Sequence, residues 1–181
     1  MKRIIAVLGA FFLSVALSCP AQAQFEKEKE GWFFGIGPQF LAETHVLKTF
    51  GGGPATQAGY RFNEFLSVYL GMDGAFTRKA QVNYWVFDLW PTVKANVIGG
   101  AFVTADFGYS LYRASGGFQF RNTFVRNAAT YSGYSVGGGV GYDFWLDDEF
   151  TISPQITLNY SRAASSSLVI PNAQVQFSWY F

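Results

Sequence analysis

The sequence predicts an all-β protein, a closed eight-stranded antiparallel transmembrane β-barrel. Three observations support this prediction. The final segment, 173–181, alternates apolar with polar side chains up to Phe181, as a strand with one apolar and one polar face does. The same period of two recurs along the chain after residue 31. Short and long links follow one another between the alternating segments, which is typical of membrane barrels.

A cleaved signal peptide is predicted over residues 1–23. A short basic segment (1–3) precedes an apolar run (4–17), and Ala21-Gln22-Ala23 has the small-x-small pattern of a cleavage site. The apolar run is too short to cross a bilayer as a helix. We therefore expect the chain to be exported.

Cys19 leaves lipidation open as an alternative. The residues before it, 16–18, match the leucine-led sequence of lipoproteins poorly, and Pro20 follows directly. Cleavage after residue 23 removes this cysteine, so the mature chain would have no disulfide or thiol chemistry. The mature chain would then begin with a charged lead-in over 24–30, expected in the periplasm, and continue as the barrel over 31–181.

The eight predicted strands share the alternating pattern and the length that a tilted membrane strand needs. They fall near 32–42, 54–62, 66–73, 84–94, 101–111, 134–144, 150–160 and 173–181. Short links are predicted near 63–64, 96–100 and 146–149, and longer surface loops near 43–53, 77–83, 114–130 and 162–171. Both termini then lie in the periplasm.

Composition separates this barrel from a soluble one. The sequence has 19% aromatic residues and 20 glycines. One face of nearly every predicted strand carries bulky aromatic or aliphatic side chains, while the other carries Gly, Ser, Thr, Asn and Gln. The second face could not form the water-excluding core of a lipocalin-like barrel. An inside-out barrel, with lipid on the apolar face, is the better interpretation.

The C-terminal strand resembles the signal that bacterial outer-membrane barrels present to their assembly machinery. Phe177, Trp179 and Phe181 place aromatic side chains at alternate positions before a terminal Phe. In length, strand number and this signal, residues 31–181 resemble the small eight-stranded family of the OmpA transmembrane domain, OmpX and OmpW. The resemblance implies a Gram-negative outer-membrane location, with the assembly machinery and periplasmic chaperones as partners during biogenesis.

Charged residues on the polar face of the strands are predicted to lie in the lumen, where they need partners or water. They are Arg61, Asp73, Asp88, Lys94, Asp106 and Asp143. Two cations among four acids suggest a paired network with some carboxylates left to water. Because an eight-stranded barrel has little room beyond its side chains, a filled lumen is favoured over a pore. A narrow channel for small solutes or apolar molecules remains the alternative.

Basic residues gather at the predicted outer rim, where Glu43 is the one acid. They are Lys48, Arg78, Lys79, Arg113, Arg121, Arg126 and Arg162. Arginine and lysine bind phosphate through charge-assisted hydrogen bonds, so we expect contact with lipopolysaccharide. Without Lys2 and Arg3, the 13 basic residues nearly balance the 12 acidic ones. Net charge therefore indicates no nucleic-acid partner.

Catalysis and cofactor binding find little support. The single histidine, His45, could be paired with Ser115 or Ser132, as in a lipid A-modifying enzyme, but no local motif accompanies either serine. One His without a mature Cys cannot form a typical transition-metal site. We expect a non-catalytic barrel, without cofactor or metal and favoured as a monomer, with a structural or surface-interaction role.

Three prolines, Pro38, Pro91 and Pro154, fall inside predicted strands, where each removes a hydrogen-bond donor. Pro38 and Pro154 would flank the C-terminal strand if the barrel closes first strand to last. Either they shape local bulges, or weakened pairing there opens the wall to a lipid. The longest predicted surface loop, 114–130, mixes Phe with Arg in a way that suits recognition.

Overall fold

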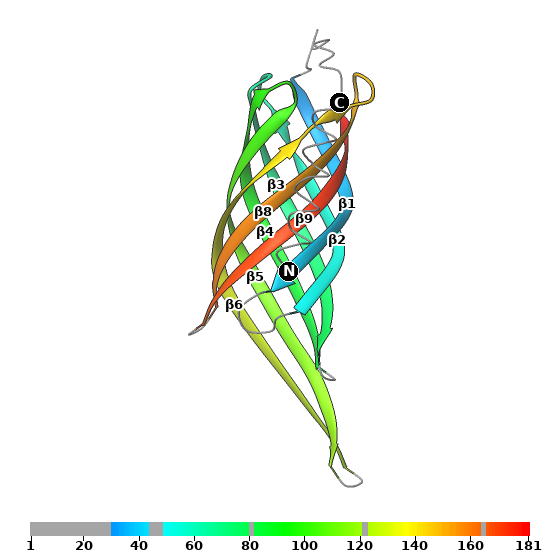
Figure 1. Cartoon of the computed structure of the whole chain (residues 1–181), viewed down its shortest axis with the longest axis vertical. Helices are drawn as coiled ribbons and strands as arrows, with labels where there is room; N and C mark the ends of the chain where they lie inside the picture. The colour runs from blue at the N-terminus through cyan, green and yellow to red at the C-terminus, as the bar shows by residue number, and fades with distance from the viewer. Residues whose placement is uncertain (1–29, 44–48, 80–81, 121–122, 164–165) are drawn as a thin grey trace, which may run out of the picture.

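The computed structural model describes residues 30–43, 49–79, 82–120, 123–163 and 166–181. These residues form one closed antiparallel barrel (Figure 1), which confirms the predicted fold class. Each long strand pairs with the next long strand in the sequence, and the first strand pairs with the last. Within the described ranges, no helix is long and apolar enough to cross a membrane.

The described residues form eight long strands and one two-residue strand. They are β1 (Gly31–Glu43), β2 (Thr49–Arg61), β3 (Leu66–Lys79), β4 (Val82–Ile98), β5 (Ala101–Phe120), β6 (Thr123–Tyr142), β7 (Phe144–Trp145), β8 (Phe150–Ala163) and β9 (Ser166–Tyr180). Strand β7 continues the course of β6 after Asp143 and pairs, like β6, with β8. The barrel therefore has the predicted eight strands, with a short break in the sixth.

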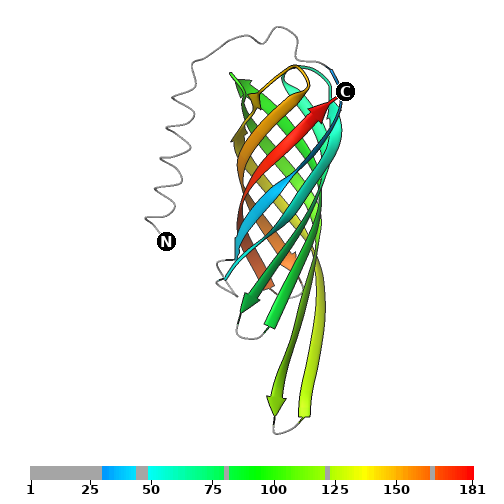
Figure 2. The same cartoon turned by 90° about the vertical axis from the view of Figure 1, so that its right-hand side faces the viewer.

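One end of the barrel, here called the terminal end, holds Gly31, Phe181 and three tight turns (Figure 2). Gly99 and Gly100 join β4 to β5 with φ angles of 56° and 90°, the positive values that a two-residue hairpin turn requires. After β2, the Asn63 side chain accepts hydrogen bonds from two backbone N–H groups at 2.9 Å. These local bonds explain why the links are short at this end.

At the opposite end, here called the hairpin end, the prediction of long loops was wrong. Strands β5 and β6 pair continuously from Ala101↔Tyr142 to Phe120↔Thr123, so the region 114–130 is a β-hairpin. It projects well beyond the other strands in both views. The regions 43–53, 77–83 and 162–171 are likewise mostly strand. Their Gly, Ser and Asn residues suggested loops, but the paired partner strand fixes the backbone.

The outward face is apolar, with aromatic residues gathered toward both ends. At the terminal end, Trp32 packs on Tyr60 with ring centroids 5.3 Å apart, and Phe150 packs on Trp179 at 5.0 Å. Toward the hairpin end, Phe76 packs on Trp85 at 4.9 Å. Exposed aliphatic side chains, including Ile36, Leu70, Met72, Val136 and Val140, lie between these groups. Such an apolar belt between two aromatic girdles is the outer surface of a membrane barrel.

The prolines on the outer wall do not open it. Pro38 and Pro154 flank β9, since Pro154 pairs with Val175 and β1 pairs with β9 on the other side. The β1–β9 ladder skips Gly37 and Pro38, yet a Cβ atom added at Gly37 would overlap the Val175 carbonyl. The two backbones are thus in close contact at this point, which argues against the lateral opening and favours a local irregularity.

Candidate functional site

The lumen is filled by inward side chains arranged in three layers along the barrel axis. An aromatic and charged layer lies at the terminal end, a polar layer in the middle, and an apolar cluster toward the hairpin end. The strands alternate faces, so every second residue contributes to one of these layers.

The terminal plug, as we call the first layer, is built around a buried ion pair. Lys94 Nζ lies 2.5 Å from Asp143 Oδ2, and both side chains are almost fully buried. Asp143 also accepts a hydrogen bond of 2.6 Å from Ser153 Oγ, and the Lys94 ammonium lies 4.0 Å from the centroid of the Phe102 ring. Each charge therefore has an opposite charge or a polar or aromatic partner, as burial requires.

Arg61 completes the terminal plug. Its guanidinium donates hydrogen bonds to the backbone carbonyls of Asn63 and Glu64 at 3.2 and 3.3 Å. It also lies 5.1 Å from the Trp145 ring and 5.9 Å from the Tyr180 ring. With 1% of its surface exposed, this arginine ties the β2–β3 turn to the interior and closes the lumen beside it.

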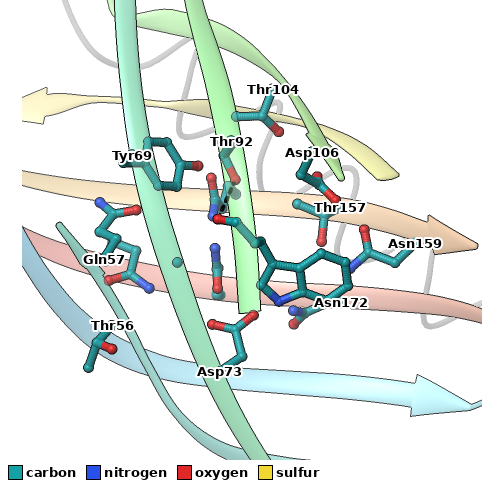
Figure 3. Close-up of a pocket in the computed structure, with 15 residues that line it drawn as sticks. Thr56, Gln57, Tyr69, Asp73, Thr92, Thr104, Asp106, Thr157, Asn159 and Asn172 are labelled. Atoms are coloured by element: carbon teal, nitrogen blue, oxygen red, sulfur yellow. Dashed lines mark hydrogen bonds between the residues drawn. The ribbon is translucent and has the colours of Figure 1, made fainter. Parts of the chain in front are cut away.

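The middle layer encloses what we call the lumenal cavity. It offers about 30 Å³ of space to water, and its walls come from β2, β3, β4, β5, β8 and β9 (Figure 3). Its lining consists of carboxyl, amide and hydroxyl groups with two aromatic rings. These residues are Thr56, Gln57, Tyr69, Gly71, Asp73, Trp90, Thr92, Thr104, Asp106, Gln155, Thr157, Asn159, Asn172, Gln174 and Gln176. No lysine or arginine belongs to this described lining.

Acidic residues gather in and beside the lumenal cavity. Asp73 and Asp106 line it, and Asp88 stands directly opposite Asp73 in the β3–β4 ladder. Asp73 and Asp88 are buried, and Asp106 is partly buried. The basic residue Lys94 lies elsewhere, in the terminal plug, where it pairs with Asp143. The six charged residues predicted for the lumen thus divide into a terminal plug and an acidic middle rather than one network.

An apolar cluster separates the lumenal cavity from the hairpin end. Leu41, Ala75 and Ile170 are buried there, and Val86 and Tyr112 pack against them. At the other end of the cavity, Phe33 stacks on Tyr180 at 5.2 Å and meets the Tyr69 ring edge-on at 6.0 Å. The polar middle layer is therefore held between two layers rich in apolar atoms.

Glycines on the inward face make room for larger side chains from neighbouring strands. A Cβ atom at Gly108 would crowd the Trp90 ring at 2.6 Å, and one at Gly141 would overlap the Phe102 ring. At Gly137, the added atom would meet the side-chain oxygens of Asn159 and Asp106. Glycine at these inward positions is therefore needed, because any larger residue would occupy the space that side chains from neighbouring strands use in so narrow a barrel.

Only part of the predicted basic rim can be placed. Arg78, Arg113 and Arg162, here called the arginine rim, are exposed on the outward face of β3, β5 and β8. Arg113 pairs with Trp85 and Arg162 with Tyr134 in the strand ladders. These residues lie on the wall toward the hairpin end rather than in loops. The backbones of Lys79 and Arg126 lie in β3 and β6, whereas Lys48 and Arg121 lie outside the described residues.

The remaining predicted sites are placed as follows. Phe177, Trp179 and Phe181 end the chain along β9, and Phe181 N donates to Trp32 O at 2.9 Å. Ser115 and Ser132 lie on β5 and β6. His45, Cys19 and the predicted signal peptide and lead-in, up to residue 29, lie outside the described residues. In the described part of the chain, no three His, Cys, Asp or Glu side chains are grouped so that they could hold a metal ion.

Sequence reasoning missed the rings of the terminal plug and the amides of the lumenal cavity. Trp145 follows a break in the strand pattern, and Tyr180 is a large ring among the polar positions of the last strand. Asn159, Asn172 and Gln176 were assigned to a polar face or not assigned at all. The alternating pattern of the sequence places these residues on the inward face of their strands. Which of them contact one another depends on the pairing between strands that are distant in the sequence.

Comparisons with known proteins agree with the fold. No protein-family model matches the sequence, and no curated protein matches it. The structure resembles Ail, the attachment invasion locus protein of Yersinia pestis, with a TM-score of 0.62 at 11% identity, covering 84% of this chain and 100% of that one. It resembles Neisserial surface protein A with a TM-score of 0.62 at 13% identity, covering 85% and 100%.

A third similar structure is the outer-membrane protein OprG of Pseudomonas aeruginosa, with a TM-score of 0.52 at 10% identity, covering 84% of this chain and 97% of that one. At such identities the similarity concerns the fold alone. The chain has the architecture of the small eight-stranded outer-membrane barrels, as its C-terminal strand and strand number predict.

Proposed function

We propose that this chain is a non-catalytic barrel of the bacterial outer membrane, whose work is done by its outer surface and whose arginine rim contacts lipopolysaccharide. The observation that carries this proposal is the position of Arg113 and Arg162 beside Trp85 and Tyr134 on the outward face. Aromatic girdles lie at the level of the lipid head groups. Arginines next to them are within reach of phosphate, which guanidinium groups bind through paired hydrogen bonds.

The filled lumen supports a surface role over a channel. The terminal plug occupies one end of the barrel, and the apolar cluster of Leu41, Ala75 and Ile170 lies toward the other. A solute would have to break the buried Lys94–Asp143 pair to pass the plug, which is costly. The narrow channel is therefore less favoured.

The projecting β5–β6 hairpin supports an interaction with other molecules. Strand β6 pairs with β8 only from Gly133 to Gly141, so its outer edge from Thr123 to Ser132 has no partner strand among the described residues. A free strand edge offers backbone donors and acceptors to an extended segment of another protein. This edge adds a second contact surface to the proposed surface role.

The test is retention of lipopolysaccharide by the purified barrel. A triple variant with Arg78→Gln, Arg113→Gln and Arg162→Gln should retain several-fold less lipopolysaccharide per barrel after purification in detergent, because it removes the proposed phosphate ligands. Its insertion into plain phosphatidylcholine vesicles should not change. A triple Arg→Lys variant keeps the charge and should retain part of the binding.

Glu64→Gln serves as the control, since Glu64 is exposed in a turn at the terminal end. It should bind like the unmodified protein. Unchanged retention of lipopolysaccharide by the triple Gln variant would overturn the proposed contact, while leaving the barrel fold untouched.

A further inference from the structure

The lumenal cavity has a chemistry that its own side chains do not complete. Acceptor-bearing side chains line it from several strands, and within the described residues the following oxygens have no hydrogen-bond partner: Asp106 Oδ1, Asn159 Oδ1, Asn172 Oδ1, Gln174 Oε1 and Gln176 Oε1. The Thr104 hydroxyl and the Trp90 Nε1–H donor of the same lining are also without a partner there, so acceptors outnumber donors. A buried acceptor without a donor is destabilising, so this cluster points to a donor or a cation as its natural occupant.

The burial of the amides distinguishes this cluster from a solvated polar surface. Asn159 is 6% exposed, Asn172 7% and Gln176 2%. Figure 3 shows Asn159 beside Asp106 and Thr157, with Asp73 across the cavity from them. Asn172 is held in place because its Nδ2 donates to Gln39 Oε1 at 2.9 Å, while its Oδ1 has no partner among the described residues.

The charged side chains of the lumenal cavity are all acidic. Asp73 and Asp106 line it, Asp88 stands opposite Asp73, and the described lining contains no basic residue. Lys94 is engaged by Asp143 in the terminal plug. Carboxylates placed opposite one another on neighbouring strands repel, and the repulsion is stronger away from bulk water. A positive charge in the cavity beside Asp73 would relieve it.

The size of the lumenal cavity limits the occupant. Its 30 Å³ leaves room for about two water molecules or one small ion. The described side chains offer no group of three carboxylate, imidazole or thiol ligands for a metal ion. Hard cations prefer oxygen ligands, and here the oxygens come mainly from neutral amides and hydroxyls. This donor set suits a small monovalent ion better than a divalent one.

We propose that the lumenal cavity binds a monovalent cation of the size of Na⁺ or K⁺. Carboxylates of Asp73 and Asp106 and amide oxygens of Asn159, Asn172 and Gln176 surround it. The bound ion is a structural element of the barrel interior, distinct from the surface role proposed above. It balances the acidic middle layer in the way that Lys94 balances Asp143 in the terminal plug.

Thermal unfolding of the refolded barrel in neutral detergent provides the first test. The unfolding temperature is measured in NaCl, in KCl and in N-methylglucamine chloride at equal ionic strength. The organic cation screens charges but is too large for the cavity. The unfolding temperature should be several degrees higher in NaCl or KCl, since a ligand that binds only the folded state stabilises it.

Variants locate the effect. Asp73→Asn and Asp106→Asn should remove the difference between the salts. Gly71→Ala offers a variant that changes space rather than charge, because its added Cβ would lie 3.7 to 3.9 Å from its nearest neighbours and overlap none of them. Gly71→Ala should reduce the difference in unfolding temperature between the salts. Asp148→Asn makes the same chemical change in an exposed turn and should leave the difference intact.

Crystals grown in RbCl give an independent readout on the unmodified protein. Anomalous scattering should show a peak between Asp73 and Asp106. Equal unfolding temperatures in all three salts, with no rubidium peak in the cavity, would overturn the proposal and leave water or shared protons to complete the site. A salt effect that survives both Asp→Asn variants would overturn it as well. Neither result bears on lipopolysaccharide binding, so the two proposals fail separately.

Discussion

The terminal plug and the lumenal cavity lie within the same barrel and share the same strands, yet they handle buried charge in opposite ways. In the plug, Lys94 meets Asp143 at 2.5 Å and Arg61 lies against two aromatic rings. In the cavity, Asp73 and Asp106 share a lining without any basic residue among the described side chains. The terminal plug pairs its own charges and closes the lumen. The middle layer, with like charges and unpaired acceptors, leaves space for a cation.

The largest effect is expected from breaking the ion pair of the terminal plug. Lys94→Met leaves the Asp143 carboxylate buried without its cation, which should lower the free energy of unfolding by about 3–5 kcal/mol. Urea unfolding of the barrel in detergent measures the change. The double variant Lys94→Met, Asp143→Leu should recover most of the loss, because it removes both charges. A double variant as unstable as the two single changes added together would contradict the account.

A smaller effect is expected from filling space in the middle layer at two different glycines. Gly137→Ala forces the side-chain oxygens of Asn159 and Asp106 to move and should cost about 1–3 kcal/mol, as overpacking does. Gly71→Ala meets its nearest atoms at 3.7 Å or more and, in N-methylglucamine chloride where no cation occupies the cavity, should stay within about 0.5 kcal/mol. The same urea experiment measures both, and equal losses would show that the lumen is looser than its contacts imply.

The smallest effect is expected at the acidic pair of the β3–β4 ladder. Asp88→Asn removes the charge opposite Asp73 and should stabilise the barrel by about 0.2–1 kcal/mol in N-methylglucamine chloride, where no bound cation offsets the repulsion. The gain should shrink in KCl, because a bound cation already relieves the repulsion. Destabilisation by this variant in both salts would mean that Asp88 has a favourable partner, and would weaken the contrast between the two layers.

The sequence predicted the faces of the strands better than their ends. Side chains alternate with a period of two whatever the strand pairs with, so Trp85 and Phe107 could be assigned outward and Asp73 and Ser110 inward, as the structure places them. The hairpin end was missed because Gly, Ser and Asn in 114–130 suggest a loop, while continuous pairing from β5 to β6 makes it a ribbon. Local composition does not reveal the partner strand.

The lumen was predictable only as a set of residues. Lys94 and Asp143 are 49 positions apart, and their meeting depends on the tilt and stagger of the strands between them. The alternating pattern carries no information on that stagger. For the same reason the separation of Asp73 and Asp106 from the two basic residues could not be read from the chain, although all of them were assigned to the interior.

The glycines of β6 have a consequence for how such a barrel could evolve. Because Gly137 gives its space to Asn159 and Asp106, and Gly141 gives its space to Phe102, the shape of the interior at this wall is set by residues on other strands. A larger side chain at Gly137 would be tolerated only with a smaller one at Asn159, so substitutions at these positions should be inherited in compensating pairs. Relatives that lose the glycine should therefore also differ at the position facing it across the β6–β8 ladder.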